Sequence, residues 1–195
     1  MEIIAHRCNS IKKLIETPKR LGVEVDIRSY GADLIIHHDP FEKGVLFEDW
    51  LKNFSHETLI LNVKEEGLEE KLIYLMESKG INKYFFLDQS FPFLLKYKNL
   101  CAGRCAVRLS EFEAIQTVLN LSGQVNWVWV DSFSSFPIGK SELIDLKEAN
   151  FKICIVSPEL QGKEPEVEIP RLKELLQSFD ITIEAVCTKR YDIWE

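Results

Sequence analysis

Two acidic residues, Glu24 and Asp26, stand two positions apart in the segment Val23–Arg28, where they alternate with aliphatic side chains. Side chains two apart on a strand point to the same face, so both carboxylates share one side of the chain. Carboxylates buried together repel each other unless a cation or a proton lies between them. Because Mg²⁺ and Ca²⁺ prefer oxygen ligands, the pair predicts a divalent-cation site. A solvent-facing edge strand carrying two surface acids is the alternative.

Two histidines lie where the chain is expected to leave a strand. His6 closes the first apolar run, and His38 is followed by Asp39 and Pro40, which stop the next one. Since imidazole titrates near neutral pH, the two rings can serve as base and acid in one displacement reaction. A histidine in either place, taken singly, is more often a structural residue.

Three cationic side chains, Arg7, Lys64 and Arg108, occupy similar strand-end positions. They are suited to neutralising a phosphate, the arginines through two parallel hydrogen bonds. Together with the histidines and the carboxylates, they predict acid–base chemistry on a small phosphate-bearing substrate.

Short β-branched or apolar runs alternate with segments of helical periodicity, and these elements must position the polar residues. The near-continuous apolar character of the runs is typical of parallel strands that are buried on both faces. The eight predicted strands are Ile3–Arg7, Val23–Arg28, Leu59–Lys64, Tyr84–Asp88, Cys105–Leu109, Trp127–Asp131, Phe151–Val156 and Ile181–Cys187. They indicate a single α/β domain over residues 1–195, a compact (β/α)8 TIM barrel whose last helix is missing or shortened. A doubly wound open sheet is the structural alternative.

Local signals mark the elements between these strands. Pro18 is expected to end a first helix, and Asp33–His38 reads as a hairpin extension of the second strand. Ser110 and Glu113 have the spacing of a capping box that opens a helix. Pro170 is expected in the first turn of the last long helix.

Composition excludes several classes of protein. Hydrophobic residues make up 46% and charged residues 28% of the 195 positions, and the net charge of −7 comes with no basic stripe for a nucleic acid. No run of about eighteen apolar residues predicts a membrane span. The absence of a secretory leader and the five cysteines, an odd number, favour reduced thiols and a cytoplasmic location. Nothing in the sequence decides the oligomeric state.

Four segments, IIAHRCN, GVEVDIR, LIIHHDP and LILNVK, resemble in order and spacing the motifs of glycerophosphodiester phosphodiesterases. Those motifs are HRG, E-x-D, HD and E-x-K. Further along, FFLDQSFP, VRLSEFE and WVWVDSF look like segments of a short bacterial branch of the same phospholipase-C-like superfamily. The resemblance implies a (β/α)8 barrel that hydrolyses phosphodiesters with the help of Mg²⁺ or Ca²⁺. The implied positions are His6 and His38 for proton transfer, Glu24 and Asp26 for the cation, and Arg7 and Lys64 for the phosphate.

The chain departs from the family pattern at two positions. Cys8 replaces the glycine of HRG, which affects the loop around the phosphate. Asn62 replaces the third metal-binding glutamate, so the expected ligand set is Glu24, Asp26 and Asn62. An amide oxygen still ligates Mg²⁺ or Ca²⁺ but contributes no negative charge, and Asp88 or Asp131 could compensate from neighbouring strand ends.

The first functional hypothesis is therefore a divalent-metal-dependent hydrolase of glycerophosphodiester-like molecules, with a role in lipid metabolism. The second is a weakly active or inactive barrel that binds a phosphorylated sugar or lipid head group, which the Asn62 substitution motivates. A third is a barrel isomerase or aldolase that uses Lys64 as a base or Schiff-base former.

Overall fold

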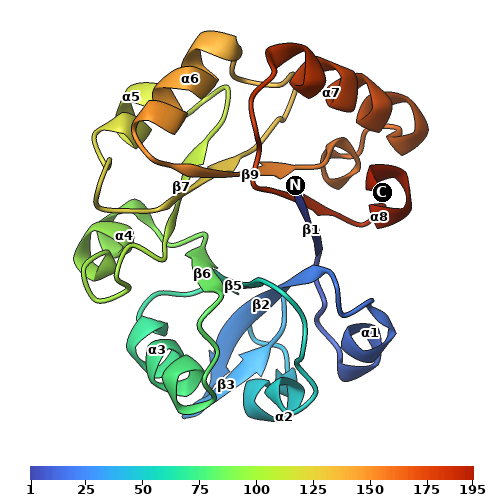
Figure 1. The fold of residues 1–195 in the computed structure, drawn as a ribbon. Helices are drawn as coiled ribbons and strands as arrows, with labels where there is room; N and C mark the ends of the chain where they lie inside the picture. The colour runs from blue at the N-terminus through green and yellow to red at the C-terminus, as the bar shows by residue number, and fades with distance from the viewer. The chain divides into compact units, whose positions relative to one another are not determined.

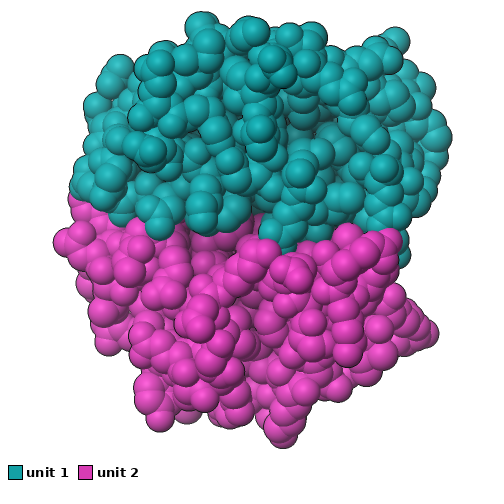
Figure 2. Space-filling view, in the orientation of Figure 1, with its two compact units in different colours: residues 1–4, 106–195 teal, residues 5–105 magenta.

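The computed structural model describes residues 1–195, which form two compact units. Unit 2 comprises Ala5–Cys105, and unit 1 comprises Ala106–Glu195 together with Met1–Ile4 (Figure 2). Both units alternate strands with helices (Figure 1).

Unit 2 is built on a mixed sheet whose strands follow the order β4-β3-β2-β5-β6. The strand β2 is parallel to β5, and β5 is parallel to β6, whereas β3 and β4 add antiparallel strands at one edge. The elements are α1 (Ile11–Glu16), β2 (Gly22–Tyr30), β3 (Asp33–Ile36), β4 (Val45–Leu46), α2 (Phe47–Leu51), β5 (Leu59–Val63), α3 (Glu69–Ser78), β6 (Tyr84–Leu87) and α4 (Phe91–Tyr97).

Unit 1 carries a sheet in the order β1-β10-β9-β8-β7, in which β7 to β10 are parallel. The helices α5, α6 and α7 lie on one side of β7 and β9 (Figure 1). The elements are β1 (Glu2–Ala5), β7 (Ala106–Leu109), α5 (Ile115–Leu119), β8 (Trp127–Val130), α6 (Lys140–Glu148), β9 (Lys152–Val156), the 3-10 turn η1 (Pro158–Gln161), α7 (Pro165–Phe179), β10 (Ala185–Thr188) and α8 (Tyr191–Trp194).

The parallel strands are buried on both faces, as their apolar sequences predict. All five residues of β5 and all four of β6 are buried, and Leu59, Leu61, Phe85 and Phe86 have no exposed surface. Other side chains therefore cover both faces of these strands, as is typical of parallel β/α folds. A side chain that points inward from such a strand is removed from water.

Each of the eight predicted strands has a counterpart, and the predicted hairpin is the antiparallel pair β2–β3. The last helix, α8, has four residues. The alternation of parallel strands and helices confirms the α/β class. Closure of the strands into one barrel, and a single domain over residues 1–195, stay predictions.

Two local predictions are wrong. Ser110 and Glu113 do not cap a helix: their side chains hydrogen-bond to each other and their backbones form a bridge, so they close a turn, and α5 begins only at Ile115. Pro170 lies inside α7, because Pro165 already holds its first position. The eighth strand also begins later than expected, at Ala185, after Asp180 ends α7 in the left-handed conformation.

Candidate active site

The two acidic residues of β2 lie on one buried face of the strand, at its third and fifth positions. Glu24 and Asp26 are both 0% exposed, and Asp26 lies directly opposite Asn62 on β5. Alternation along β2 explains why the two side chains share a face, and the parallel pairing with β5 explains why Asn62 joins them. We refer to Glu24 and Asp26 as the carboxylate pair.

The surroundings of Glu24 perturb its pKa. Burial and the negative charge of Asp26 raise the pKa of Glu24 to about 7, although hydrogen bonds to its charged form act in the opposite direction. Those bonds come from the backbone N–H of Arg7 at 2.6 Å and from the Asn62 amide at 2.8 Å. His6 Nε2 lies 3.8 Å from Glu24 Oε2. A buried carboxylate that titrates near neutral pH beside an imidazole is a typical feature of catalytic sites.

Asp26 is surrounded by cationic and amide donors. Asn9 donates to Asp26 Oδ2 at 2.7 Å and accepts from the backbone N–H of Asp26 at 3.0 Å. Lys64 Nζ lies 3.3 Å from Oδ1, and Arg7 Nε lies 3.6 Å from Oδ2. The predicted phosphate-binding residues Arg7 and Lys64 are therefore both next to the carboxylate pair. Asn9 was not predicted, although it closes the IIAHRCN segment.

Asp88 also belongs to this cluster. Its carboxylate lies 2.9 Å from Lys64 Nζ, so Lys64 connects Asp88 to Asp26. Asp88 and Arg7 both have positive φ, 62° and 51°, immediately after β6 and β1. The left-handed conformation costs a non-glycine residue roughly 1–2 kcal/mol, and such strain is concentrated at functional sites.

Buried contacts fix the loop after β1 to the rest of unit 2. Cys8 is fully buried, and its thiol contacts Ala5 and Thr17. The indole N–H of Trp50 donates to the carbonyl of Cys8 at 2.8 Å, and the N–H of Cys8 donates to the carbonyl of Glu24 at 2.7 Å. The Cys8 side chain therefore packs into the core of unit 2, while the backbone of the loop is tied to β2.

His38 occupies the loop after β3 and is more exposed than His6. Its Nδ1 lies 2.8 Å from Asp39 Oδ1, and its carbonyl accepts a hydrogen bond from Arg28. The hydrogen bond with His38 is the main cause that lowers the pKa of Asp39, and the charge of Arg7 acts in the same direction. The loop that carries His38 therefore lies within electrostatic range of Arg7.

The donor types of the carboxylate pair and Asn62 fit a hard divalent cation. Asn62 Oδ1 and Asp26 Oδ1 are buried and accept no hydrogen bond, although the ammonium of Lys64 lies 3.3 Å from Asp26 Oδ1. No group of three or more His, Cys, Asp or Glu side chains in residues 1–195 has the arrangement of a metal site. The predicted ligand set contains two carboxylates and one amide, and this amide donates to Glu24.

Two further predicted residues lie in unit 1. Arg108 donates to Asp131 Oδ2 at 2.7 Å, and Asp131 also accepts from Trp129 and Gln161. Arg108 and Asp131 thus bind each other at the ends of β7 and β8. Their suggested roles, phosphate binding and metal compensation, stay predictions.

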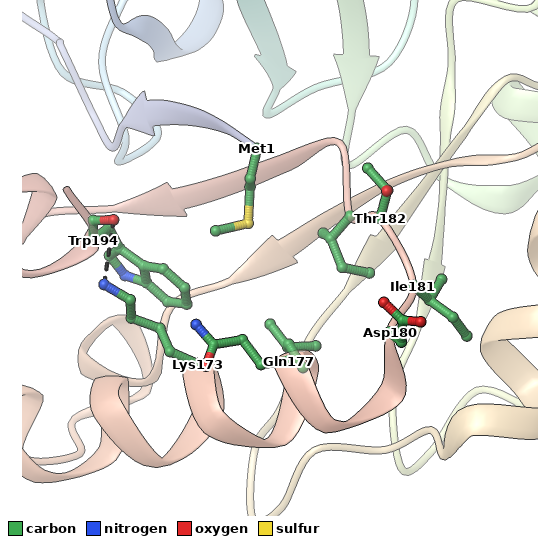
Figure 3. Close-up of a pocket in the computed structure, with 9 residues that line it drawn as sticks. Met1, Lys173, Gln177, Asp180, Ile181, Thr182 and Trp194 are labelled. Atoms are coloured by element: carbon green, nitrogen blue, oxygen red, sulfur yellow. Dashed lines mark hydrogen bonds between the residues drawn. The ribbon is translucent and has the colours of Figure 1, made fainter.

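A separate pocket of about 390 Å³ lies in unit 1, between α7 and the segment before β10. Lys173, Gln177 and Trp194 line it, and Lys173 Nζ donates to the carbonyl of Trp194 (Figure 3). The pocket lies at the amino-terminal end of β10, whereas chemistry in parallel β/α folds collects at the carboxyl ends of strands. We therefore place the candidate active site in unit 2.

The remaining general features agree with the sequence. No helix is long and apolar enough to cross a membrane. All five cysteines are free thiols in buried positions.

No family model and no curated protein matches the chain in sequence. In structure, the chain is similar to a glycerophosphodiester phosphodiesterase from Agrobacterium tumefaciens, with a TM-score of 0.64 and 11% identity over 100% of this chain and 97% of that one. It is also similar to a glycerophosphoryl diester phosphodiesterase from Parabacteroides distasonis, with a TM-score of 0.66 and 12% identity over 97% and 82% of the two chains.

A third similar structure, a tryptophan synthase complex from Pyrococcus furiosus, has a TM-score of 0.51 and 12% identity over 96% of this chain and 86% of that one. Since one fold serves several chemistries, these likenesses define architecture, and activity must be argued from the site. Over its whole length, the chain has the α/β fold found in glycerophosphodiester phosphodiesterases.

Proposed function

We propose that the chain is a divalent-metal-dependent phosphodiester hydrolase that acts on a glycerophosphodiester-like small molecule. The proposal includes closure of the parallel strands into one (β/α)8 barrel, as the fold of the similar phosphodiesterases suggests. It also includes a cytoplasmic location, since five free cysteines suit a reducing compartment, and a role in lipid metabolism.

One observation carries the proposal: His6, Glu24, Asp26, Arg7 and Lys64 gather in unit 2, where Glu24 and Asp26 lie on β2, His6 and Arg7 follow β1, and Lys64 follows β5. These are the positions that match the family motifs. A buried acid pair, an imidazole and two cations in one place provide the charges that phosphodiester hydrolysis requires. A purely structural cluster would not need an imidazole next to a carboxylate with a pKa near neutrality.

Glu24, Asp26 and Asn62 would hold the cation, Mg²⁺ or Ca²⁺. When bound, such an ion polarises the phosphoryl oxygens and stabilises the charge that develops on them. Asp26 Oδ1 and Asn62 Oδ1, which accept no hydrogen bond, would ligate it, with Asp26 Oδ1 exchanging the nearby ammonium of Lys64 for the ion. Their donor types suit either ion.

Arg7 and Lys64 would bind the non-bridging phosphate oxygens, and the two histidines would move protons. One histidine removes the proton from the attacking oxygen while a new P–O bond forms, and the other gives a proton to the departing alkoxide. Asp39, at 2.8 Å from His38 Nδ1, orients the exposed ring. The buried Glu24, at 3.8 Å from Nε2, does the same for His6.

The experiment is hydrolysis of a panel of glycerophosphodiesters by the purified protein in the presence of Mg²⁺ or Ca²⁺. We expect His6→Ala and His38→Ala each to lower kcat by at least about 10²-fold, the usual contribution of general acid–base catalysis. His37→Ala is the matched control. His37 is adjacent to His38, and its side chain bonds only to the backbone carbonyl and the backbone N–H of Asp39. Full activity in both His6→Ala and His38→Ala would disprove the assignment.

A second candidate is a weakly active or inactive barrel that binds a phosphorylated sugar or lipid head group. It is favoured by the donation of the Asn62 amide to Glu24 and by the position of Lys64 between Asp26 and Asp88, because both compensate carboxylate charge without a metal. Calorimetry separates the candidates: phosphoester binding that persists without any Mg²⁺ or Ca²⁺ binding supports the binding module.

The third hypothesis, Schiff-base chemistry at Lys64, is the least supported. The nitrogen of Lys64 is held by two carboxylates, at 2.9 and 3.3 Å, which would have to release it before it could attack a carbonyl. Absence of an adduct after borohydride treatment with a carbonyl substrate would count against it.

A further inference from the structure

A second group of acidic side chains surrounds a pocket of about 230 Å³ beyond the carboxyl ends of β5 and β6. We call it the Glu69 pocket. Its polar lining consists of Lys64, Glu65, Glu66, Glu69, Asp88, Gln89 and Ser90. Four carboxylates thus face one ammonium group, so the lining is strongly negative.

Glu69 is the unusual member of this lining. It is the first residue of α3 and is 0% exposed, although carboxylates are almost never fully buried without a partner. Its only hydrogen bond comes from the amide nitrogen of Gln89 to Oε1, at 3.0 Å. Oε2 is buried and accepts no hydrogen bond, and no cationic side chain pairs with Glu69.

The neighbouring carboxylates have compensation that Glu69 lacks. Asp88 lies 2.9 Å from Lys64 Nζ, and Glu65 lies 3.9 Å from Arg28 while accepting a backbone N–H. Glu66 is exposed and accepts from the hydroxyl of Ser90. The shortage of positive charge is therefore local to Glu69.

The Gln89 amide indicates which kind of ligand would supply the positive charge missing at Glu69. Its nitrogen donates to Glu69, and its oxygen Oε1 is buried and accepts no hydrogen bond. Two unsatisfied oxygens, one from a carboxylate and one from an amide, thus belong to two side chains that touch each other and line the same pocket. Both atoms accept and neither donates, which selects a cation rather than an anion.

Neither the helix terminus nor a water molecule is enough to account for a buried Glu69. The amino terminus of α3 carries a partial positive charge that favours an acid there, but this effect is small beside the cost of burying a carboxylate. A water molecule could donate to both oxygens, yet it would leave the negative charge uncompensated. A bound cation satisfies the two oxygens and the charge together.

We propose that the Glu69 pocket binds Ca²⁺ through Glu69 Oε2 and Gln89 Oε1, with the Asp88 carboxylate and water completing the shell. Calcium takes six to eight oxygen ligands in flexible geometry and accepts carboxylates, amide carbonyls and water together. This site is distinct from the carboxylate pair, because Lys64 lies between Asp26 and Asp88. It does not depend on the proposed hydrolase activity.

The test is Ca²⁺ titration of the full chain by calorimetry up to about 1 mM, the upper range of dissociation constants for protein calcium sites. We expect Glu69→Gln to remove one bound Ca²⁺ per chain. Glu70→Gln, which removes the same charge from the next and exposed residue of α3, should bind as the wild type does. Glu24→Gln should keep this site whether or not the carboxylate pair binds a metal, so the two proposals fail independently.

A second variant keeps the test decisive if Glu69→Gln does not fold, as judged by circular dichroism. Gln89→Met preserves the side-chain volume and removes only the amide ligand, so we expect at least about tenfold weaker Ca²⁺ binding. The Ca²⁺-induced rise in melting temperature should shrink in parallel, since a ligand that binds only the folded chain stabilises it. No Ca²⁺ binding by the wild type, or wild-type binding by a folded Glu69→Gln chain, would overturn the proposal.

Discussion

Units 1 and 2 both place acidic residues after parallel strands but surround them differently. In unit 1, Asp131 accepts hydrogen bonds from Arg108, Trp129 and Gln161. Glu111 accepts from three consecutive backbone N–H groups of residues 133–135 and from the hydroxyl of Ser134. Each acid there has several donors and holds a loop in place.

In unit 2 the acids are placed side by side with fewer donors. Glu24 and Asp26 share one face of β2 without exposure, and an oxygen of Asp26 accepts no hydrogen bond. The pKa values show the contrast: desolvation acts to raise that of Glu111, but hydrogen bonds lower it to about 2, whereas burial and Asp26 raise that of Glu24 to about 7. Asp131 and Glu111 each accept several hydrogen bonds, whereas the carboxylate pair keeps one oxygen that accepts none and one carboxyl whose pKa is raised to about 7.

The largest expected loss of stability comes from removing the ammonium group of Lys64, which pairs with the acids of unit 2. Lys64→Met leaves the buried Asp26 and its neighbour Asp88 without their shared ammonium. We expect the free energy of unfolding to fall by about 3 kcal/mol, as when one partner of a buried ion pair is removed. Urea denaturation of the wild type and of the variant measures this fall in the free energy of unfolding.

Lys52→Met is the control, because Lys52 pairs with Asp49 on the surface. Its effect should stay within about 0.5 kcal/mol. Equal losses in the two variants would mean that the unit 2 acids do not depend on Lys64.

A smaller loss of unfolding free energy is expected when a buried indole N–H donor is removed from either unit. Trp50→Phe removes the donor to the buried carbonyl of Cys8, and an unsatisfied buried acceptor costs about 1–3 kcal/mol. Trp194→Phe removes a donor to the hydroxyl of Ser157, which still bonds to Glu159, so we expect a loss of about 1 kcal/mol. Both are read from chemical denaturation, and a larger loss in Trp194→Phe would contradict this order.

The smallest expected effect is the change with pH of the stability that Glu111 contributes to unit 1. Because the pKa of Glu111 is lowered, its contribution to stability is present above about pH 4.5 and is lost as the pH falls towards 2. The melting temperature of Glu111→Gln should therefore lie below that of the wild type at pH 6 and approach it near pH 2. Glu174→Gln, at an exposed position of α7, is the control. If the difference in melting temperature between the wild type and Glu111→Gln stays constant from pH 6 to pH 2, Glu111 does not contribute the pH-dependent stability predicted for unit 1.

The strands and the faces of their side chains were predictable because both depend on short-range patterns. Alternation along β2 was enough to put Glu24 and Asp26 on one side. The hairpin β2–β3 followed from its turn residues. These features need no knowledge of distant contacts.

What failed depends on choices that a local pattern leaves open. The spacing of Ser110 and Glu113 suits a helix cap or a closed turn, and the chain forms the turn. The contacts of Asn9 with Asp26, and the burial of Glu69, arise only when β1, β2 and α3 come together. Asn62 was expected as a ligand, and its donation to Glu24 could not be foreseen because an amide has both a donor and an acceptor end.

The left-handed conformation of Arg7 has a practical consequence. It turns the backbone N–H towards Glu24, to which it donates at 2.6 Å. A proton in so short a bond to a carboxylate should resonate far downfield and exchange slowly with solvent. One cross-peak in a ¹H–¹⁵N spectrum would then follow the charge of Glu24 directly. Spectroscopists would have a built-in reporter for every proton, cation or ligand that reaches the carboxylate pair.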